Sequence, residues 1–245
     1  MNSTIGNDLT AEMAVLAASR SDTYAFLSSF FMQLPDNSFV ERIRELGMND
    51  WSTDLDEDGF AELIQEGFQL IQNYASSIID IPAETVLLDI SRDRTKLIRG
   101  VMKGYGPPPP YEFAYAGFNE ASRIRERKLA QLHYEEAGVG LKEEVKSSPD
   151  FIGVELDFMR YLTLTEAKAW EEERIDEACE MLHKQQAFLQ EHLVSWVPKY
   201  CELMFEDAQL DFYRGVARLI KGFVLYENER VTEYLNEAES NKTIT

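Results

Sequence analysis

The chain has 245 residues, of which 44% are hydrophobic and 11% aromatic, enough to bury a substantial core without disulfide bonds. Its 44 acidic and 24 basic residues give a formal net charge of −20, which argues against nucleic acid or an anionic membrane surface as the partner. The two cysteines lack a disulfide-framework spacing, the N-terminus lacks a signal-peptide pattern, and no apolar run reaches the roughly 18 residues of a membrane span, so we expect a soluble cytoplasmic protein.

Helical periodicity, with apolar residues three and four positions apart, dominates the N-terminal part of the chain, and strand alternation is almost absent. The pattern predicts a long first helix over 8–34 that ends at Pro35, and a short helix from Asn37 with its C-terminal cap at Gly47. A third helix is predicted after the acidic run DLDEDG and a fourth after Pro82. The segment GYGPPPP ends the fourth helix, because proline has no backbone donor and glycine adds backbone freedom.

The C-terminal part continues the helical pattern. A fifth helix is predicted over 112–136, and the irregular segment GVGLKEEVKSSPD separates it from a sixth over 151–169. Further helices are predicted over 172–193, 197–205 and 208–234. No repeat or linker divides the chain, so the sequence predicts an all-α fold of about nine or ten helices in a single globular domain over 1–235, with a polar, frayed tail at 236–245.

The sequence contains no pattern that specifies catalysis or metal binding. His133, His183 and His192 are scattered, and although Cys179 lies one helical turn from His183, two ligands do not make a site. A phosphate-binding loop, a dinucleotide fingerprint and a nucleophile elbow are all absent, and the many acidic pairs are most simply a solvated face. We therefore expect no catalytic residue, no metal site, no cofactor and no enzymatic activity.

Two segments carry a resemblance to a known family. The first is LIRGVMKGYGPPPPYEFAYAG, in which a helix end, a glycine, a proline run and an aromatic-Glu-x-x-Tyr motif follow one another, and the second is HYEEAGVGLKEEVKSSPDFIGVELDFMRYL. With the C-terminal FLQEHLVSWVPKYCELMF, they resemble the TorD/DmsD/NarJ family of cytoplasmic chaperones for molybdenum-containing redox enzymes. The resemblance covers roughly 97–223 and implies a TorD-like helical fold. One position departs from the family pattern, since Phe151 stands where the family has a histidine after the motif aspartate.

The resemblance also implies a function. It identifies the partner as the precursor of a molybdopterin oxidoreductase, bound through its twin-arginine signal peptide until the cofactor is inserted. An arginine pair requires carboxylates that accept charge-assisted hydrogen bonds, and the apolar part of a signal peptide requires an aromatic wall. The resemblance therefore implies a groove between 110–111 and 148–150, with peptide-binding residues Pro110, Tyr111, Tyr115, Asp150, Phe151 and Glu155.

The residues of the first segment also have structural interpretations. Tyr111 and Tyr115 lie four positions apart, and aromatic residues at helical spacing usually belong to a core, an interpretation that we favour for Tyr115. The proline run can serve to end one helix and begin the next, with Pro110 near the first helical position. Trp196 and Phe212 are predicted to be core residues.

The second segment has structural interpretations too. In Ser148-Pro149-Asp150, Ser148 fits an N-cap, Pro149 the first helical residue and Asp150 a first-turn anion stabilised by the helix dipole. Glu155 fits either an exposed position on a half-buried helix or, as we favour, a buried carboxylate paired with Arg160 or with an arginine of another helix. For the whole chain, the alternatives to a chaperone are a helical enzyme with a carboxylate-bound divalent metal and a generic helical adaptor.

Overall fold

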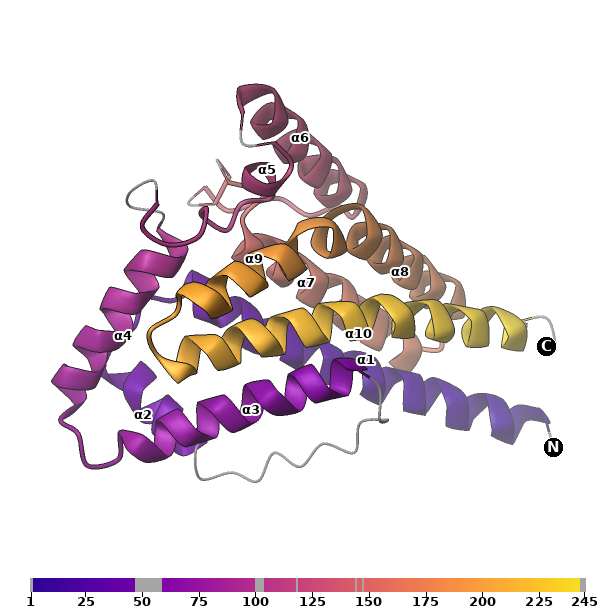
Figure 1. Ribbon diagram of the computed structural model, residues 1–245. Coiled ribbons are helices and arrows are strands. Elements are labelled where there is room, and N and C mark those ends of the chain that lie inside the picture. The colour runs from indigo at the N-terminus through magenta and orange to yellow at the C-terminus, as the bar shows by residue number, and fades with distance from the viewer. Residues whose placement is uncertain are drawn as a thin grey trace. The chain divides into compact units, whose positions relative to one another are not determined.

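The computed structural model describes residues 2–46, 59–99, 104–117, 119–143, 145–146 and 148–242, and the side chains of 10–240 within these ranges. In this part of the chain there are ten α-helices, one π-helical turn and no β-strand, which confirms the all-α class (Figure 1). The elements are α1 (Asn2–Met32), α2 (Asn37–Leu46), α3 (Gly59–Ser77), α4 (Ala83–Ile98), α5 (Glu112–Tyr115), α6 (Glu120–Glu136), α7 (Ile152–Glu171), α8 (Ile175–Phe188), the π-helical turn η1 (Leu189–Leu193), α9 (Val194–Asp207) and α10 (Asp211–Lys242). None of the described helices combines the length and the apolar character needed to cross a membrane.

The chain divides into two compact units, and each is described by itself. Unit 1 comprises Met1–Met32, Glu120–Ser195 and Glu227–Thr245, and unit 2 comprises Gln33–Asn119 and Trp196–Tyr226. The boundaries between the units therefore fall inside α9 and α10 as well as between elements. The single domain over 1–235 and the frayed tail at 236–245 stay predictions.

Most predicted helices are present, but several boundaries differ from the sequence pattern. The predicted fifth helix is interrupted between α5 and α6, where Gly117 has a φ of 144°, a backbone conformation that side chains other than glycine rarely adopt. Helix α1 begins at Asn2 and α10 continues to Lys242, eight residues past the predicted end at Tyr234. The predicted cap at Gly47 and most of the run DLDEDG lie outside the described residues.

Unit 1 is built on α7, which packs against both α1 and α8. Thirteen of its twenty residues are buried. Gly153 lets α1 approach closely, because a Cβ added there would lie 2.8 Å from the Met32 sulfur, and the Ser28 hydroxyl donates to the Gly153 carbonyl at 2.8 Å. The start of α7 is therefore held directly against α1.

A buried polar network joins four helices of unit 1 around Arg20 of α1. Its guanidinium donates to Glu166 of α7 at 3.0 Å, to Glu227 of α10 at 2.8 Å and to the side-chain oxygen of Gln185 of α8. Gln185 and Trp170 also donate to Glu166, at 2.8 and 3.1 Å. Burial raises the pKa of Glu227, and the charge of Arg20 offsets only part of this effect. The network is thus a charged interior whose stability depends on complete pairing.

Unit 2 contains the packing of α2 against α3 and α4, and a close approach of α3 to the first part of α10. The approach occurs at a pair of glycines, since a Cβ on Gly67 would lie 2.8 Å from the carbonyl oxygen of Gly215. The predicted core residues Trp196 and Phe212 are both buried in this unit, 1% and 0% exposed, as expected.

Replacing Gly215 by alanine should destabilise the protein by about 1–3 kcal/mol, the usual cost of overpacking a core. The added Cβ would lie 2.6 Å from both the Gly67 carbonyl oxygen and a methylene of Ile71, and the backbone oxygen cannot rotate away. Urea unfolding measures the loss, with Gly59→Ala as the matched control because no atom lies within 4 Å of its added Cβ. Equal stability of the two variants would show that α3 and α10 do not approach in this way.

Candidate functional site

The end of α4 contacts both the segment before α10 and the glycine that precedes the proline run of unit 2. Asp93 of α4 accepts hydrogen bonds from the backbone amides of Gln209 and Leu210, at 3.0 and 2.9 Å, just before α10 begins. Lys96 donates to the carbonyl oxygen of Asp207 at 2.5 Å. Gly106, with a φ of 96°, packs so closely that a Cβ would lie 2.4 Å from the carbonyl oxygen of Lys96. The second glycine of GYGPPPP, Gly106, is therefore required because the chain passes so close to the backbone of α4.

Tyr115 contacts both the proline run and α9. Its hydroxyl donates to the carbonyl oxygen of Pro108 at 2.7 Å, and its ring stacks on Trp196 with 5.4 Å between ring centroids. The ring of Tyr200 lies 6.0 Å away in an edge-to-face arrangement, and burial raises the pKa of the Tyr115 hydroxyl. Tyr115 is half-buried and packs against the buried core residues Trp196 and Tyr200, so it lies at the edge of the core.

Tyr111 lies at the point where the proline run becomes a helix. It is the N-cap of α5, and its amide donates to the carbonyl oxygen of Pro109 at 2.8 Å. Pro110 is buried and lies two residues before Glu112, the first residue of α5, and therefore near the first helical position as predicted. The Tyr111 ring is half-buried and lies 5.9 Å from the ring of Phe113. Tyr111 thus offers part of an aromatic surface on a fixed backbone.

Asp150 lies in the turn before α7 and not inside the helix. The prediction that Ser148 caps the helix and that Asp150 lies in its first turn is wrong, because α7 begins at Ile152 with Phe151 as its N-cap. The Asp150 side chain is fully buried and accepts a hydrogen bond from Nε of Arg127 of α6 at 3.1 Å. Asp150 therefore ties the turn to α6 through a charged pair.

The same turn is fixed to α6 by a second contact. The hydroxyl of Tyr134 donates to the carbonyl oxygen of Pro149 at 2.7 Å, and the Tyr134 side chain is buried. After α6, Gly138 has a φ of 71° and accounts for the predicted helix end, because the amide of Val139 returns to the carbonyl oxygen of Tyr134 at 2.8 Å. The chain is thus anchored to α6 both just after the helix, at Val139, and just before α7, at Pro149.

Phe151 and Glu155 follow on the first turn of α7. The carbonyl oxygen of Phe151 accepts from the amides of Val154 and Glu155, at 2.8 and 3.0 Å, and the half-buried Phe151 ring lies 6.3 Å from the ring of Phe31. Glu155 is fully buried, which agrees with the predicted burial of its carboxylate. Arg160, which the sequence offered as its partner together with an arginine of another helix, donates to Asp157 at 2.6 Å.

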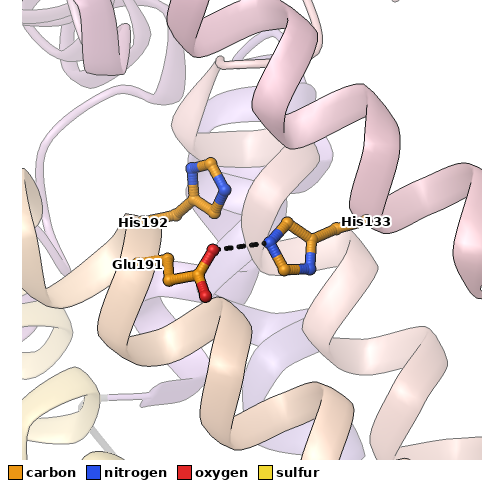
Figure 2. Close-up of side chains that lie close together, drawn as sticks. All are labelled: His133, Glu191 and His192. Carbon is orange, nitrogen blue, oxygen red and sulfur yellow. Dashed lines mark hydrogen bonds and ion pairs between the residues drawn. The ribbon is translucent and has the colours of Figure 1, made fainter.

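Sequence spacing missed a cluster near the C-terminal end of α6. His133 of α6 meets Glu191 and His192 of η1 (Figure 2), with 3.1 Å between His133 Nε2 and Glu191 Oε2 and 5.1 Å between the two imidazole ring centroids. The ring of Phe188 stacks on His192 at 4.7 Å. The three polar residues come from segments far apart in the sequence, and no local motif connects them.

The six predicted peptide-binding residues are divided between the units. Asp150, Phe151 and Glu155 lie together at the start of α7 in unit 1. The other three, Pro110, Tyr111 and Tyr115, lie together around α5 in unit 2. The groove that would join the two groups stays a prediction.

Comparisons with known proteins agree with the motifs. The family model described as nitrate reductase delta subunit matches residues 57–202, more than half of the chain. Chaperone protein TorD of Vibrio cholerae serotype O1 (strain M66-2) is 21% identical over 233 residues, covering 92% of this chain and 98% of that protein. The proteins of the same name from Vibrio parahaemolyticus serotype O3:K6 and Photobacterium profundum are 22% and 23% identical, covering 86% and 83% of this chain and 94% and 90% of their own lengths. The chain therefore belongs to the nitrate reductase delta subunit family, which confirms its resemblance to the TorD/DmsD/NarJ proteins.

Proposed function

We propose that this chain is a cytoplasmic chaperone that binds the twin-arginine signal peptide of a molybdopterin oxidoreductase precursor. It holds the precursor while the cofactor is inserted and the enzyme is assembled, before export. The observation that carries the proposal is the family match, together with relatives named as chaperone proteins along nearly the whole chain. Catalysis by the chain itself is no part of the proposed function.

The charge of the chain supports a basic ligand. A net charge of −20 attracts a peptide that carries an arginine pair and raises its rate of association, most strongly at low ionic strength. Guanidinium groups bind carboxylates through two parallel hydrogen bonds, which distinguishes arginine from lysine. A receptor for such a peptide therefore needs at least one well-placed carboxylate beside an apolar surface.

We propose Asp150 as that carboxylate. It is buried and already paired with Arg127, whose side chain is 32% exposed and therefore accessible to solvent. A guanidinium from the peptide would replace that of Arg127, so the buried carboxylate would remain paired throughout. The exchange avoids the cost of several kcal/mol that an uncompensated buried charge carries. Arg127 would move into solvent, where its charge is readily hydrated.

The aromatic residues have complementary proposed roles. Phe151 follows Asp150 directly and is half-buried, so its ring can pack against apolar side chains of the peptide. Tyr111 in unit 2 is half-buried in the same way and is proposed as a second aromatic contact. Pro110 and Tyr115 are proposed to fix the backbone that presents Tyr111, since the Tyr115 hydroxyl donates to Pro108, and the buried Glu155 is proposed to support the start of α7.

Affinity purification of the tagged full chain from its native host tests the function. The expected result is recovery of a molybdopterin oxidoreductase precursor that still carries its twin-arginine signal, and loss of that recovery when the signal is deleted from the precursor. Retention of the enzyme without its signal would contradict peptide recognition, and a partner of another class would contradict the chaperone assignment.

A further inference from the structure

The three polar residues in Figure 2 form a cluster that the proposed function does not use. His133 belongs to α6, and Glu191 and His192 are neighbours in η1. One ligand atom from each residue, an imidazole nitrogen or a carboxylate oxygen, lies within 4.8 Å of the corresponding atoms of the other two. We propose that His133, Glu191 and His192 bind a divalent transition-metal ion, with zinc as the best match. The proposal replaces the expectation of no metal site, which rested on sequence spacing.

The chemistry of the three ligands selects the class of metal. Two imidazoles and one carboxylate suit zinc, copper, nickel and cobalt, whereas calcium and magnesium prefer all-oxygen sites. Ligand atoms about 2 Å from a tetrahedral zinc ion lie about 3.3 Å from one another. The pair formed by His133 and Glu191 already lies at 3.1 Å, and a ligand atom of His192 lies within 4.8 Å of both, so side-chain rotations have to bring His192 closer to close the site. Solvent can then supply the fourth ligand.

The surroundings hold two of the three ligands in place. His192 is 1% exposed and stacks on Phe188, whose ring also meets His133 edge-to-face at 5.5 Å. The Glu191 side chain is 63% exposed, so an ion can approach from the solvent side and be closed in by the carboxylate. Little conformational entropy is lost on binding, because the buried imidazole is already ordered.

The backbone at the cluster is unusual as well. Residues Leu189–Leu193 form a π-helical turn between α8 and α9, and such turns are rare and frequently found at functional sites. The turn brings two residues that are adjacent in the sequence, Glu191 and His192, to the same partner on α6. A bound ion would therefore join α6 directly to η1.

The chain also contains a matched pair without a third ligand. His183 and Glu239 lie 3.2 Å apart, with side chains 54% and 52% exposed. In the part of the chain that the structure describes, neither residue belongs to a group of three potential ligands. This pair has the same chemistry as His133 with Glu191. A comparison of His183→Ala with His133→Ala therefore distinguishes a three-ligand site from ordinary binding of metal to surface histidines.

Calorimetric titration of the EDTA-treated full chain with zinc chloride tests the proposal. Wild type should bind one zinc ion per chain, with no comparable binding of magnesium or calcium. His133→Ala and His192→Ala should each weaken zinc binding by about 100-fold or more, since even outer-shell partners of metal ligands contribute about 10–100-fold. Glu191→Gln should weaken binding in the same direction, and His183→Ala should bind as wild type does.

A spectroscopic measurement keeps the test independent of folding defects. Cobalt added to wild type should give visible absorption bands of a tetrahedral site, and His133→Ala, whose imidazole is less buried than that of His192, should lose them while keeping its helical circular dichroism. Zinc should also raise the melting temperature of wild type, because a ligand that binds only the folded state stabilises it. Binding that is equally strong in all four variants, or is weakened by His183→Ala as much as by His133→Ala, would overturn the proposal.

Discussion

Replacing Arg20 by methionine should lower the free energy of unfolding by about 3–5 kcal/mol, the usual loss when one member of a buried ion pair is removed. Arg20 donates hydrogen bonds to Glu166, Glu227 and Gln185, and its side chain is only 7% exposed. Without the guanidinium, two carboxylates would remain buried with no counter-charge. They would have to take up protons or draw water into the interior, and both responses destabilise the fold.

Urea unfolding at neutral pH measures this loss, with Arg123→Met as the matched control. Arg123 pairs with Glu120 on the surface of α6, where such pairs contribute only about 0.2–1 kcal/mol. The double variant Arg20→Met/Glu227→Gln should lose less than the sum of the single changes, because the second substitution removes one of the abandoned charges. A loss for Arg20→Met no larger than that for Arg123→Met would show that the network does not hold the four helices together.

Replacing Asp150 by asparagine should weaken binding of a twin-arginine peptide by about 10–150-fold, which corresponds to about 1.5–3 kcal/mol for a hydrogen bond to a charged group. The amide keeps the shape of the side chain and removes its charge. Arg127→Gln should have the opposite effect on affinity, because it removes the internal guanidinium that competes for the same carboxylate. If the two substitutions change peptide affinity in opposite directions, the peptide guanidinium replaces that of Arg127. A purely structural ion pair would not give this result.

Calorimetric titration with the peptide gives both affinities, and melting curves give the stabilities. Arg125→Gln is the matched control, because its side chain is on the same helix, 65% exposed and paired with Glu126. It should leave affinity unchanged. If Asp150→Asn lowers the melting temperature without changing affinity, Asp150 only anchors the turn before α7. Weaker binding by both Asp150→Asn and Arg127→Gln would likewise contradict the exchange.

Much of the fold followed from local patterns in the sequence. Apolar spacing and the helix-breaking residues Pro35 and Gly138 placed most helices correctly, because both signals act within a few residues. The break at Gly117 was missed, since a single glycine inside a helical pattern is often tolerated. The start of α7 was misplaced because Ser148-Pro149-Asp150 also satisfies the rules for a helix N-terminus, whereas the side chain of Asp150 turns to Arg127.

The polar network around Arg20 and the cluster around His133 could not be predicted from the sequence, for a different reason. Arg20 and Glu227 lie 207 positions apart, and His133 and Glu191 lie 58 apart, so only the packing of helices brings them together. Helical periodicity identifies a buried face but does not say which charged residue on it meets which partner. The motif residues were found through resemblance to a family, which located the segments around Tyr111 and Asp150 but not their contacts.

Recognition of an arginine pair is the central feature of the proposed function, and a titration with two matched peptides tests it most directly. The full chain is titrated with a twin-arginine signal peptide and with the same peptide carrying two lysines. We expect the chain to bind one arginine peptide. Because lysine cannot form the bidentate pair, the lysine peptide should bind at least about tenfold more weakly than the arginine peptide. Added salt should weaken the arginine complex. Equal affinity for the two peptides, or no binding of either, would contradict the account.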